Sequence, residues 1–436
     1  MNIFFVSLGC DKNLVDSEVM LGLLDAKGYQ IVDDETQADV MVINTCCFIH
    51  DAKEESIQTI LDMARYKEEG RLKALVVTGC LAQRYKQEII DEIPEVDVVL
   101  GTTSYDKIVE AVEEALEGKS EVELADIDAL PLPETKRLVT TGGHYAYLKI
   151  AEGCDKHCTY CIIPKVRGNY RSVPMERLIK EAQELADQGV KELILVAQET
   201  TVYGQDIYGE KSLHKLLKEL CQIKGIRWIR VLYCYPEEIY DELIQTMAES
   251  KKICHHLHLP LQSGSSRVLK EMNRRYDKEK YLELVNKIRK AIPDISLTTD
   301  IMVGFPGETE EDFQETLDVV RKANYDTAFT FIYSKRSGTP AAGMENQVPE
   351  DVVKDRFSRL LSLVQEKGRE NSSRFQGSVQ EVLVEDENRE KGTLTGRTQH
   401  NLLVHFPGEK DLIGKYVKVS LDTCKGFYYF GHIVEE

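Results

Sequence analysis

Short apolar runs alternate with amphipathic helical patterns over the first 117 residues. The first apolar run covers residues 3–9, and Asp16 and Ser17 are suited to begin a helix after it. Further strands are predicted at 38–44, 72–78 and 96–100, and further helices at 52–66, 82–93 and 105–117. Strands that alternate with helices predict an α/β fold with a parallel, doubly wound sheet.

A second series of alternating elements begins with a strand at 145–150. The later strands are predicted at 192–197, 228–233, 256–261, 296–303 and 327–333. The helices are predicted at 174–188, 211–223, 237–249, 278–291 and 309–323. These roughly six βα units are fewer than the eight of a closed barrel, so we expect a partial (βα)6 barrel that stays open.

The pattern changes near the C-terminus. A long amphipathic helix is predicted at 349–372, outside the barrel. From Gly377 onward, short β-rich runs separated by glycines predict a small five-stranded β-barrel. An acidic stretch with two prolines, 118–138, lacks helical periodicity and is predicted to be a linker. The expected domains are 1–118, 140–370 and 371–436, with the linker at 119–139.

The charge of the chain is strongly acidic. Its 436 residues include 55 Lys and Arg against 74 Asp and Glu, a net charge of −19. Such a protein is poorly suited to bind phosphate backbones and better suited to attract a basic protein. The first residues lack the regions of a secretion signal, and no apolar run is long enough to span a membrane. We therefore expect a cytoplasmic protein whose eleven cysteines serve metal binding or catalysis.

Cys154, Cys158 and Cys161 follow the strand at 145–150 with C-x3-C-x2-C spacing. One short loop with this spacing is able to hold a single inorganic centre. Three thiolates are one fewer than a structural zinc or iron–sulfur site requires, so a 4Fe-4S cluster held here keeps one iron open. The alternative is a zinc loop, in which His157 would have to supply the fourth ligand from within the loop.

Three further cysteines, Cys10, Cys46 and Cys80, lie just past the ends of the first three predicted strands. The carboxyl ends of parallel strands meet at one edge of a sheet, where ligands bind in open α/β folds. The pattern indicates a second metal site. The alternative is that each cysteine is an ordinary small apolar residue in the core.

Turns after later barrel strands supply polar candidates for cofactor contacts. They are Gln198 and Glu199, Gln262 and Ser263, and Gly304 and Glu308. Each set also fits a plain turn that begins the next helix. The run from Cys254 to His258 contains three histidines, but neighbouring residues on a strand face opposite sides, which favours packing and hydrogen bonding over metal binding.

At this point the chain resembles a known family, the methylthiotransferases among the radical S-adenosylmethionine enzymes. The C-x3-C-x2-C loop is similar to the radical S-adenosylmethionine signature. Gly396, Arg397, Thr398, Asn401 and Phe406 are similar to the pattern of a C-terminal TRAM domain. The resemblance covers the chain essentially from end to end.

The resemblance implies two 4Fe-4S clusters, one on Cys154, Cys158 and Cys161 and an auxiliary one on Cys10, Cys46 and Cys80. S-adenosylmethionine would bind the open iron of the first cluster, and its radical would abstract a hydrogen from the substrate carbon. The auxiliary cluster would carry the inserted sulfur. Flavodoxin or ferredoxin is the kind of electron donor implied. No catalytic side chain beyond the cluster ligands is expected.

Two branches of the family differ in substrate. Gly9-Cys10-Asp11-Lys12-Asn13, residues 44–49 and residues 148–154 resemble the branch that modifies the β-carbon of an aspartate on a small-subunit ribosomal protein, giving 3-methylthio-aspartate. The acidic charge agrees, because ribosomal proteins are basic. Residues 259–265 and Thr299-Asp300 look more like the branch that modifies an adenosine in tRNA, which is the alternative. The TRAM domain is expected to contact the substrate.

A function of a different class is also compatible with these features. An iron–sulfur or zinc module could dock on the ribosome through its terminal barrel without catalysing a reaction. Three cysteines at equivalent strand ends disfavour this alternative, because docking alone does not require a second metal site.

Overall fold

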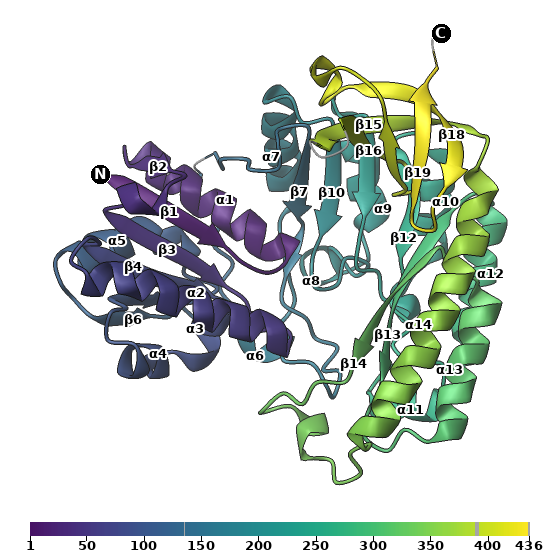
Figure 1. The fold of residues 1–436 in the computed structure, drawn as a ribbon, viewed down its shortest axis with the longest axis horizontal. Coiled ribbons are helices and arrows are strands. Elements are labelled where there is room, and N and C mark those ends of the chain that lie inside the picture. The colour runs from purple at the N-terminus through teal and green to yellow at the C-terminus, as the bar shows by residue number, and fades with distance from the viewer. Residues whose placement is uncertain (135, 389–391, 435–436) are drawn as a thin grey trace.

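The computed structural model describes residues 1–134, 136–388 and 392–434. The described residues form two six-stranded parallel sheets, then a closed five-stranded barrel (Figure 1). The predicted fold class is confirmed. None of the helices in these residues is long and apolar enough to cross a membrane.

The N-terminal sheet is doubly wound. Its strand order is β2 (Gln30–Val32), β1 (Asn2–Ser7), β3 (Val40–Thr45), β4 (Ala74–Gly79), β5 (Val98–Leu100) and β6 (Glu121–Glu123). One face packs against α1 (Asp11–Ala26) and α5 (Ile108–Leu116). The other face packs against α2 (His50–Glu68), α3 (Cys80–Tyr85) and α4 (Gln87–Glu92).

Several boundaries of this sheet differ from the predictions. Helix α1 begins at Asp11, not near Asp16, because Cys10 is its N-cap and Asp11 suits the dipole of the first turn. The predicted helix at 82–93 is two short helices, interrupted at Lys86, whose φ is +49°. Strands β2 and β6 escaped prediction because each has only three residues, and β6 lies within the predicted linker.

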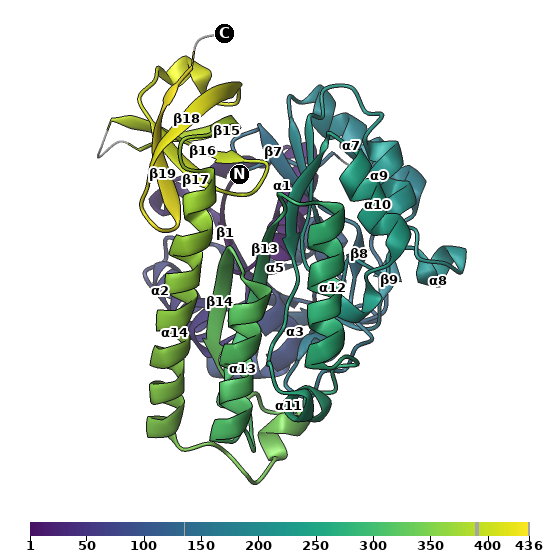
Figure 2. The ribbon, with the colours of Figure 1, turned by 90° about the vertical axis from the view of Figure 1, so that its right-hand side faces the viewer.

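The central sheet is an open half-barrel in which spatial order follows chain order. It consists of β7 (Tyr145–Lys149), β10 (Glu192–Val196), β11 (Trp228–Val231), β12 (Ile253–His258), β13 (Ser296–Val303) and β14 (Thr327–Ile332). Its outer face is covered by α7 (Met175–Asp187), α9 (Leu213–Leu220), α10 (Asp241–Glu249), α12 (Lys278–Ala291), α13 (Glu310–Ala323) and α14 (Glu350–Ser372) (Figure 2).

The remaining elements of this part are short. They are β8 (Ala151–Glu152), α6 (Ile163–Arg167), β9 (Arg171–Ser172), α8 (Gln205–Tyr208) and α11 (Ser266–Glu271). Strand β12 starts at Ile253, three residues before the predicted start, because Ile253 and Cys254 are both buried in the sheet.

The C-terminal barrel closes in the order β15 (Val379–Asn388), β16 (Thr393–Thr398), β17 (Leu403–Phe406), β19 (Tyr428–Ile433) and β18 (Tyr416–Cys424). Alternate residues of these strands fill its core, with Val382, Val404 and Phe406 fully buried. The predicted five-stranded barrel is confirmed.

A buried ion pair attaches this barrel to the central sheet. Glu192 on β10 accepts hydrogen bonds from Arg230 (2.7 Å) and from Arg397 of the barrel (3.2 Å). Arg230 also donates to the carbonyl oxygens of Thr398 and Gln399. Burial opposes ionisation of Glu192, but the two guanidinium groups outweigh it and lower its pKa.

Glu192→Gln should destabilise the protein by about 3–5 kcal/mol, because it leaves two guanidinium groups without their shared carboxylate in a buried contact. Urea unfolding followed by circular dichroism measures the loss. Glu381→Gln is the matched control, because Glu381 pairs with Arg227 at a half-exposed site and should contribute about 1 kcal/mol or less. Equal losses in the two variants would contradict the prediction.

Candidate functional site

The first turn of α1 meets the loop that follows β11. The Lys12 amino group lies 3.2 Å from the centre of the Tyr233 ring, and the Tyr233 hydroxyl lies 3.4 Å from the Asp11 carboxylate. Asp11 and Lys12 follow the first predicted ligand cysteine, and Tyr233 lies just past the end of β11. Tyr233 has φ of +60°, a strained conformation for a bulky residue. The strain lies at the contact between the sheets.

The N-terminal cysteines occupy neighbouring strand ends, as predicted. Cys46 directly follows β3 and Cys80 directly follows β4, while Cys10 caps α1 after β1. These three strands are adjacent in the sheet, and Thr45 pairs with Gly79. Cys47, by contrast, directs its sulfur at the Cys80 carbonyl oxygen, 3.3 Å away.

Asn13 brings the three cysteine segments together. Its side-chain amide donates to the carbonyl oxygens of Leu8 (3.0 Å) and Thr45 (2.9 Å). Its side-chain oxygen lies 3.7 Å from the sulfur of Cys80. A single fully buried residue on the first turn of α1 therefore contacts all three cysteine-bearing segments.

Gly9 shows how closely two of these segments approach. Its φ is +95°, and a Cβ atom there would lie 2.7 Å from the Cβ and 2.9 Å from the sulfur of Cys46. Only glycine avoids both the strained backbone and the overlap. The residue that precedes Cys10 thus lies directly against Cys46.

The second cysteine loop lies between β8 and α6. Cys154 and Cys158 are buried and Cys161 is partly exposed. Backbone hydrogen bonds hold the loop, from the amide of Cys154 to Gly168 (3.1 Å) and from the amide of Cys161 to Cys158 (2.9 Å). Asn273 donates to two further carbonyl oxygens of the loop, those of Lys156 and His157.

Each cysteine set has one sulfur that accepts a hydrogen bond from a buried arginine, and the two arginines are different residues. Arg274 donates to Cys158 at 3.6 Å, and its guanidinium lies over the rings of Tyr235 and Tyr276. Arg167 donates to Cys80 at 3.4 Å. Cationic donors aimed at sulfur suit a thiolate, the form in which cysteine binds metal.

In the described residues, the spacing of the cysteine sets does not match a single tetrahedral ion. Burial raises the pKa of four of the thiols, those of Cys46, Cys80, Cys154 and Cys161. Burial keeps these thiols protonated, whereas binding of a metal displaces the proton and leaves the thiolate as the ligand. A tetrahedral zinc ion needs sulfurs about 3.8 Å apart, given bonds of about 2.3 Å. Among the described residues, neither cysteine set has its three sulfurs within 4.8 Å of one another.

Helix α6 joins the two cysteine regions. It begins two residues after Cys161, and its Val166, with the preceding Ile162, belongs to the hydrophobic core of the N-terminal sheet. The hydroxyl of Thr102 donates to the Val166 carbonyl oxygen at 2.8 Å. The segment that leaves the second cysteine loop is therefore part of the first core.

Arg167, the last residue of α6, lies in a buried network of charges. It donates to Asp16 (2.7 Å) and Glu152 (3.1 Å), and Lys149 pairs with the same two carboxylates. Burial opposes ionisation of Glu152, but Lys149 and Arg167 outweigh it and lower its pKa. Asp16 belongs to α1 and the other three to the central part, so the network crosses between the sheets.

Gln198 and Glu199 lie beside the second cysteine loop. Gln198 donates to Glu152 at 2.6 Å, and Glu199 accepts from the amide of Thr201 at 2.7 Å. Among the described residues, one side-chain oxygen of each is buried without a hydrogen-bond partner. Burial raises the pKa of Glu199 to about 7. Unpartnered buried oxygens here favour a bound polar ligand.

The other predicted cofactor residues have different surroundings. Gln262 lines a cleft, with φ of +67°. The Ser263 hydroxyl is fully buried and contacts Ser265 and Thr316 within a helix-capping turn. Glu308 accepts from the amide of Gly304 (3.0 Å) and from Arg356 of α14 (2.9 Å). Gly304 and Glu308 thus contact α14.

The cleft opens between the two sheets. Phe48 and Ile49 of the N-terminal part line one side, and the rest of its lining comes from the central part: Tyr160, Gln262, Asp300, Met302, Phe331, Ile332, Tyr333, Ser334 and Arg336. Arg336 lies over the ring of Phe48, 4.6 Å from its centre. The cleft is largely apolar and lies next to Tyr160 of the second cysteine loop.

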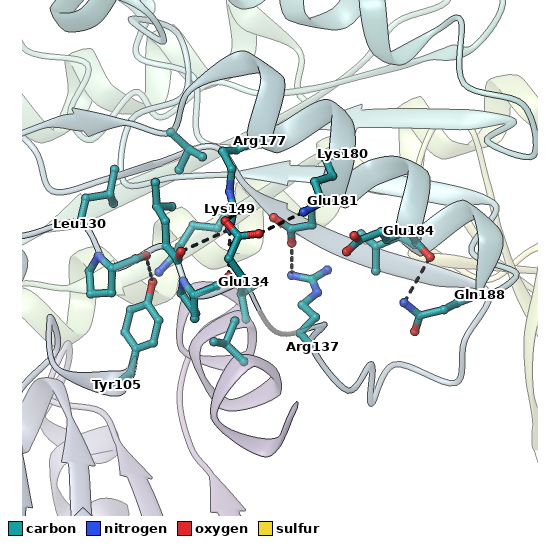
Figure 3. Close-up of a pocket in the computed structure, with 17 residues that line it drawn as sticks. Tyr105, Leu130, Glu134, Arg137, Lys149, Arg177, Lys180, Glu181, Glu184 and Gln188 are labelled. Carbon is teal, nitrogen blue, oxygen red and sulfur yellow. Dashed lines mark hydrogen bonds and ion pairs between the residues drawn. The ribbon is translucent and has the colours of Figure 1, made fainter. Parts of the chain in front are cut away.

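A second cavity lies between α1 and α7, beside residues 130–134 and Arg137 (Figure 3). Glu134 there pairs with Arg177 (2.6 Å) and Lys180 (3.1 Å), and Arg137 pairs with Glu181 (3.1 Å). None of the six candidate ligand cysteines is among its lining residues. These contacts attach the segment between the two sheets to α7.

The histidines of β12 make hydrogen bonds, as the strand pattern favoured. His258 contacts Thr298 (3.0 Å) and Asp300 (3.2 Å). His255 contacts Asp294, which also contacts His400 of the C-terminal barrel. These three residues lie close enough to hold an ion, but the two hydrogen bonds already satisfy the carboxylate.

Sequence reasoning missed the residues that surround the cysteines. Asn13, Arg167 and Arg274 have no spacing rule that relates them to a distant thiol, because their contacts arise only in the folded chain. The available signal was local: Asn13 lies three residues after Cys10, and Arg167 six residues after Cys161.

Comparison with known proteins agrees with this organisation. The chain matches the models of the uncharacterized protein family UPF0004 over residues 2–101, the Radical SAM superfamily over 148–320 and the TRAM domain over 373–434. It is 52% identical to the ribosomal protein uS12 methylthiotransferase RimO of Lachnoclostridium phytofermentans, over 99% of each chain. It is 44% identical to the protein of the same name from Desulforamulus reducens, over the full length of both chains.

Solved structures show the same fold at low sequence identity. The radical S-adenosylmethionine methyltransferase TsrM from Kitasatospora setae is 14% identical, with a TM-score of 0.58, over 78% of this chain and 75% of that one. The radical enzyme OxsB gives a TM-score of 0.53 at 13% identity, over 84% of this chain and 56% of that one.

Gly304→Ala should lower the melting temperature more than Gly307→Ala. Both glycines have φ of +78°, but a Cβ atom at Gly304 would lie 2.6 Å from Val353 of α14, whereas Gly307 has open space. Both variants incur backbone strain, and overlap with Val353 adds about 1–3 kcal/mol at Gly304. Differential scanning fluorimetry compares them, and equal shifts would contradict the contact between Gly304 and α14.

Proposed function

The chain belongs to the RimO family of radical S-adenosylmethionine methylthiotransferases, and from that premise we propose that it transfers a methylthio group to ribosomal protein uS12. The acceptor is the β-carbon of an aspartate, and the product is 3-methylthio-aspartate. The observation that carries this proposal is the pair of cysteine sets at the boundary between the two parallel sheets, in a chain 52% identical to a protein named for this reaction.

We propose two 4Fe-4S clusters. Cys154, Cys158 and Cys161 would hold the one that binds S-adenosylmethionine, and Cys10, Cys46 and Cys80 the auxiliary one. When bound, the clusters and S-adenosylmethionine would supply the electron, the radical that abstracts hydrogen, the inserted sulfur and the methyl group. The arginines beside Cys80 and Cys158 would stabilise the ligating thiolates.

The unpartnered oxygens of Gln198 and Glu199 are the best-supported contacts for S-adenosylmethionine. Both are acceptors, and the cofactor carries an ammonium group that donates. Gln262 lines the cleft and suits a contact with cofactor or substrate. Ser263, Gly304 and Glu308 have their polar groups within turns, so their proposed role is to position the loops at this edge.

The cleft between Phe48 and the central sheet suits entry of the substrate loop. Its apolar lining excludes water around the reacting carbon, which protects a radical from side reactions. The net charge of −19 favours association with a basic protein. We propose that the TRAM domain contacts substrate outside the cleft, where His405, Tyr428 and Phe430 form a half-buried aromatic group.

The tRNA alternative loses most of its support. Residues 259–265 and Thr299-Asp300 resemble the tRNA branch; Leu259, Leu261, Ser263 and Thr299 among them are fully buried, whereas Gln262 and Asp300 line the cleft. The identities of the four buried residues therefore serve the barrel core, and the relatives with which this chain is 44–52% identical are named for uS12. The docking alternative without catalysis is disfavoured by two convergent cysteine sets, because docking alone requires neither.

Three further assignments complete the proposal. Flavodoxin or ferredoxin would supply electrons, since the chemistry needs a low-potential donor. A ribosomal substrate places the reaction in the cytoplasm. The proposed domain limits are 1–118, 140–370 and 371–436 with residues 119–139 as the linker, and β6 extends the N-terminal sheet into that linker as far as Glu123.

Cys80→Ala should abolish methylthiolation of uS12 and keep formation of 5′-deoxyadenosine, because it removes a ligand of the auxiliary cluster alone. Cys158→Ala should abolish both. Anaerobic reconstitution with S-adenosylmethionine and dithionite, followed by mass spectrometry of uS12 and of the nucleoside, measures each product.

Cys47→Ala is the matched control, because Cys47 is buried beside the site and its sulfur contacts a backbone oxygen. It should retain both products. A wild-type enzyme that forms no 5′-deoxyadenosine would refute the enzyme proposal. One that modifies tRNA adenosine and leaves uS12 unmodified would refute the substrate.

A further inference from the structure

We propose that Arg167 is a positioning residue that sets the reduction potential of the auxiliary cluster from across the domain boundary. The inference rests on the proposed cluster at Cys10, Cys46 and Cys80. Arg167 follows Cys161, a ligand of the other cluster, by six residues. One short segment therefore carries a ligand of one cluster and a hydrogen-bond donor to the other.

The contacts of Arg167 use all three of its nitrogen atoms. Nε donates to the sulfur of Cys80 at 3.4 Å. Nη1 donates to Asp16 at 2.7 Å and to Glu152 at 3.1 Å, and Nη2 donates to the side-chain oxygen of Asn13. The side chain is 2% exposed, so these partners, not water, fix its direction.

The charges around Arg167 balance without the thiolate. Asp16 and Glu152 are two negative groups, and Lys149 and Arg167 are two positive groups in contact with them. The effect of the guanidinium on Cys80 is therefore mainly that of a directed hydrogen bond, because its positive charge is already balanced by the carboxylates. Hydrogen bonds to cluster sulfurs stabilise the reduced, more electron-rich state and raise the potential.

Asn13 connects Arg167 to the segments that carry the other two cysteines of the set. Its side chain accepts from Arg167 and donates to the carbonyl oxygens of Leu8 and Thr45, next to two of the ligand segments. Arg167 thereby fixes the orientation of the residue that joins the three segments. Lysine has no planar fork and is unable to make the sulfur, amide and carboxylate contacts together.

The experiment uses the full-length protein with Cys154, Cys158 and Cys161 replaced by alanine, so that only the auxiliary cluster forms. Its midpoint potential is measured by a redox titration followed by electron paramagnetic resonance. Iron and sulfide content is determined first. A parent protein that binds no cluster refutes the proposed function, a result distinct from failure of this inference.

Arg167→Gln should lower the midpoint potential. At the parent midpoint, the ratio of reduced to oxidised cluster should fall about tenfold, which is about 59 mV for one electron. Arg167→Lys should shift it in the same direction, because lysine keeps the charge and lacks the Nε donor. Lys149→Gln is the matched control, since Lys149 belongs to the same network without contacting Cys80, and should change the ratio less than threefold.

An unchanged potential in Arg167→Gln would overturn the inference. So would an equal shift in Lys149→Gln, which would assign the effect to net charge. If Arg167→Gln loses iron, Arg167→Lys decides, because it keeps the buried charge paired. A cluster-loaded Arg167→Lys with the parent potential would then overturn it.

Discussion

A guanidinium buried between two sheets is the interaction on which this architecture depends. Arg167 is 2% exposed and contacts Asp16 and Asn13 on one side and Glu152 on the other. Removing one partner of such a buried network costs about 3–5 kcal/mol. The two halves therefore have one favourable orientation, in which every charge is paired. That orientation places both cysteine sets at the same boundary.

Apolar packing and the charged network support each other at that boundary. Ile162 and Val166 enter the N-terminal core, so α6 cannot separate from it without exposing apolar surface. The open half-barrel leaves the cleft beside Phe48 accessible, while the C-terminal barrel attaches at the far end of the sheet through Glu192. The C-terminal barrel is thus attached at the end of the central sheet opposite to the cleft and the cysteine sets.

The fold and the grouping of the six candidate ligand cysteines were predictable because strand periodicity and cysteine spacing are local signals. The ends of strands in a parallel sheet converge, so the sequence alone predicted that Cys10, Cys46 and Cys80 lie close together. The same rule also selected Gly304 and Glu308, whose contacts are with α14, because position at a strand end does not reveal what lies opposite. Asn13 and Arg167 were missed because only tertiary contacts relate them to a sulfur. Residues 259–265 resembled the tRNA branch and so kept that alternative open, although most of them are buried in the core.

The central claim is that two clusters lie at the boundary held by Arg167. Iron-edge anomalous diffraction from anaerobically reconstituted crystals tests it most directly. Two four-iron peaks should appear, one at Cys10, Cys46 and Cys80 and one at Cys154, Cys158 and Cys161, both at the boundary between the two parallel sheets. A single four-iron peak, or a second one away from that boundary, would contradict the account.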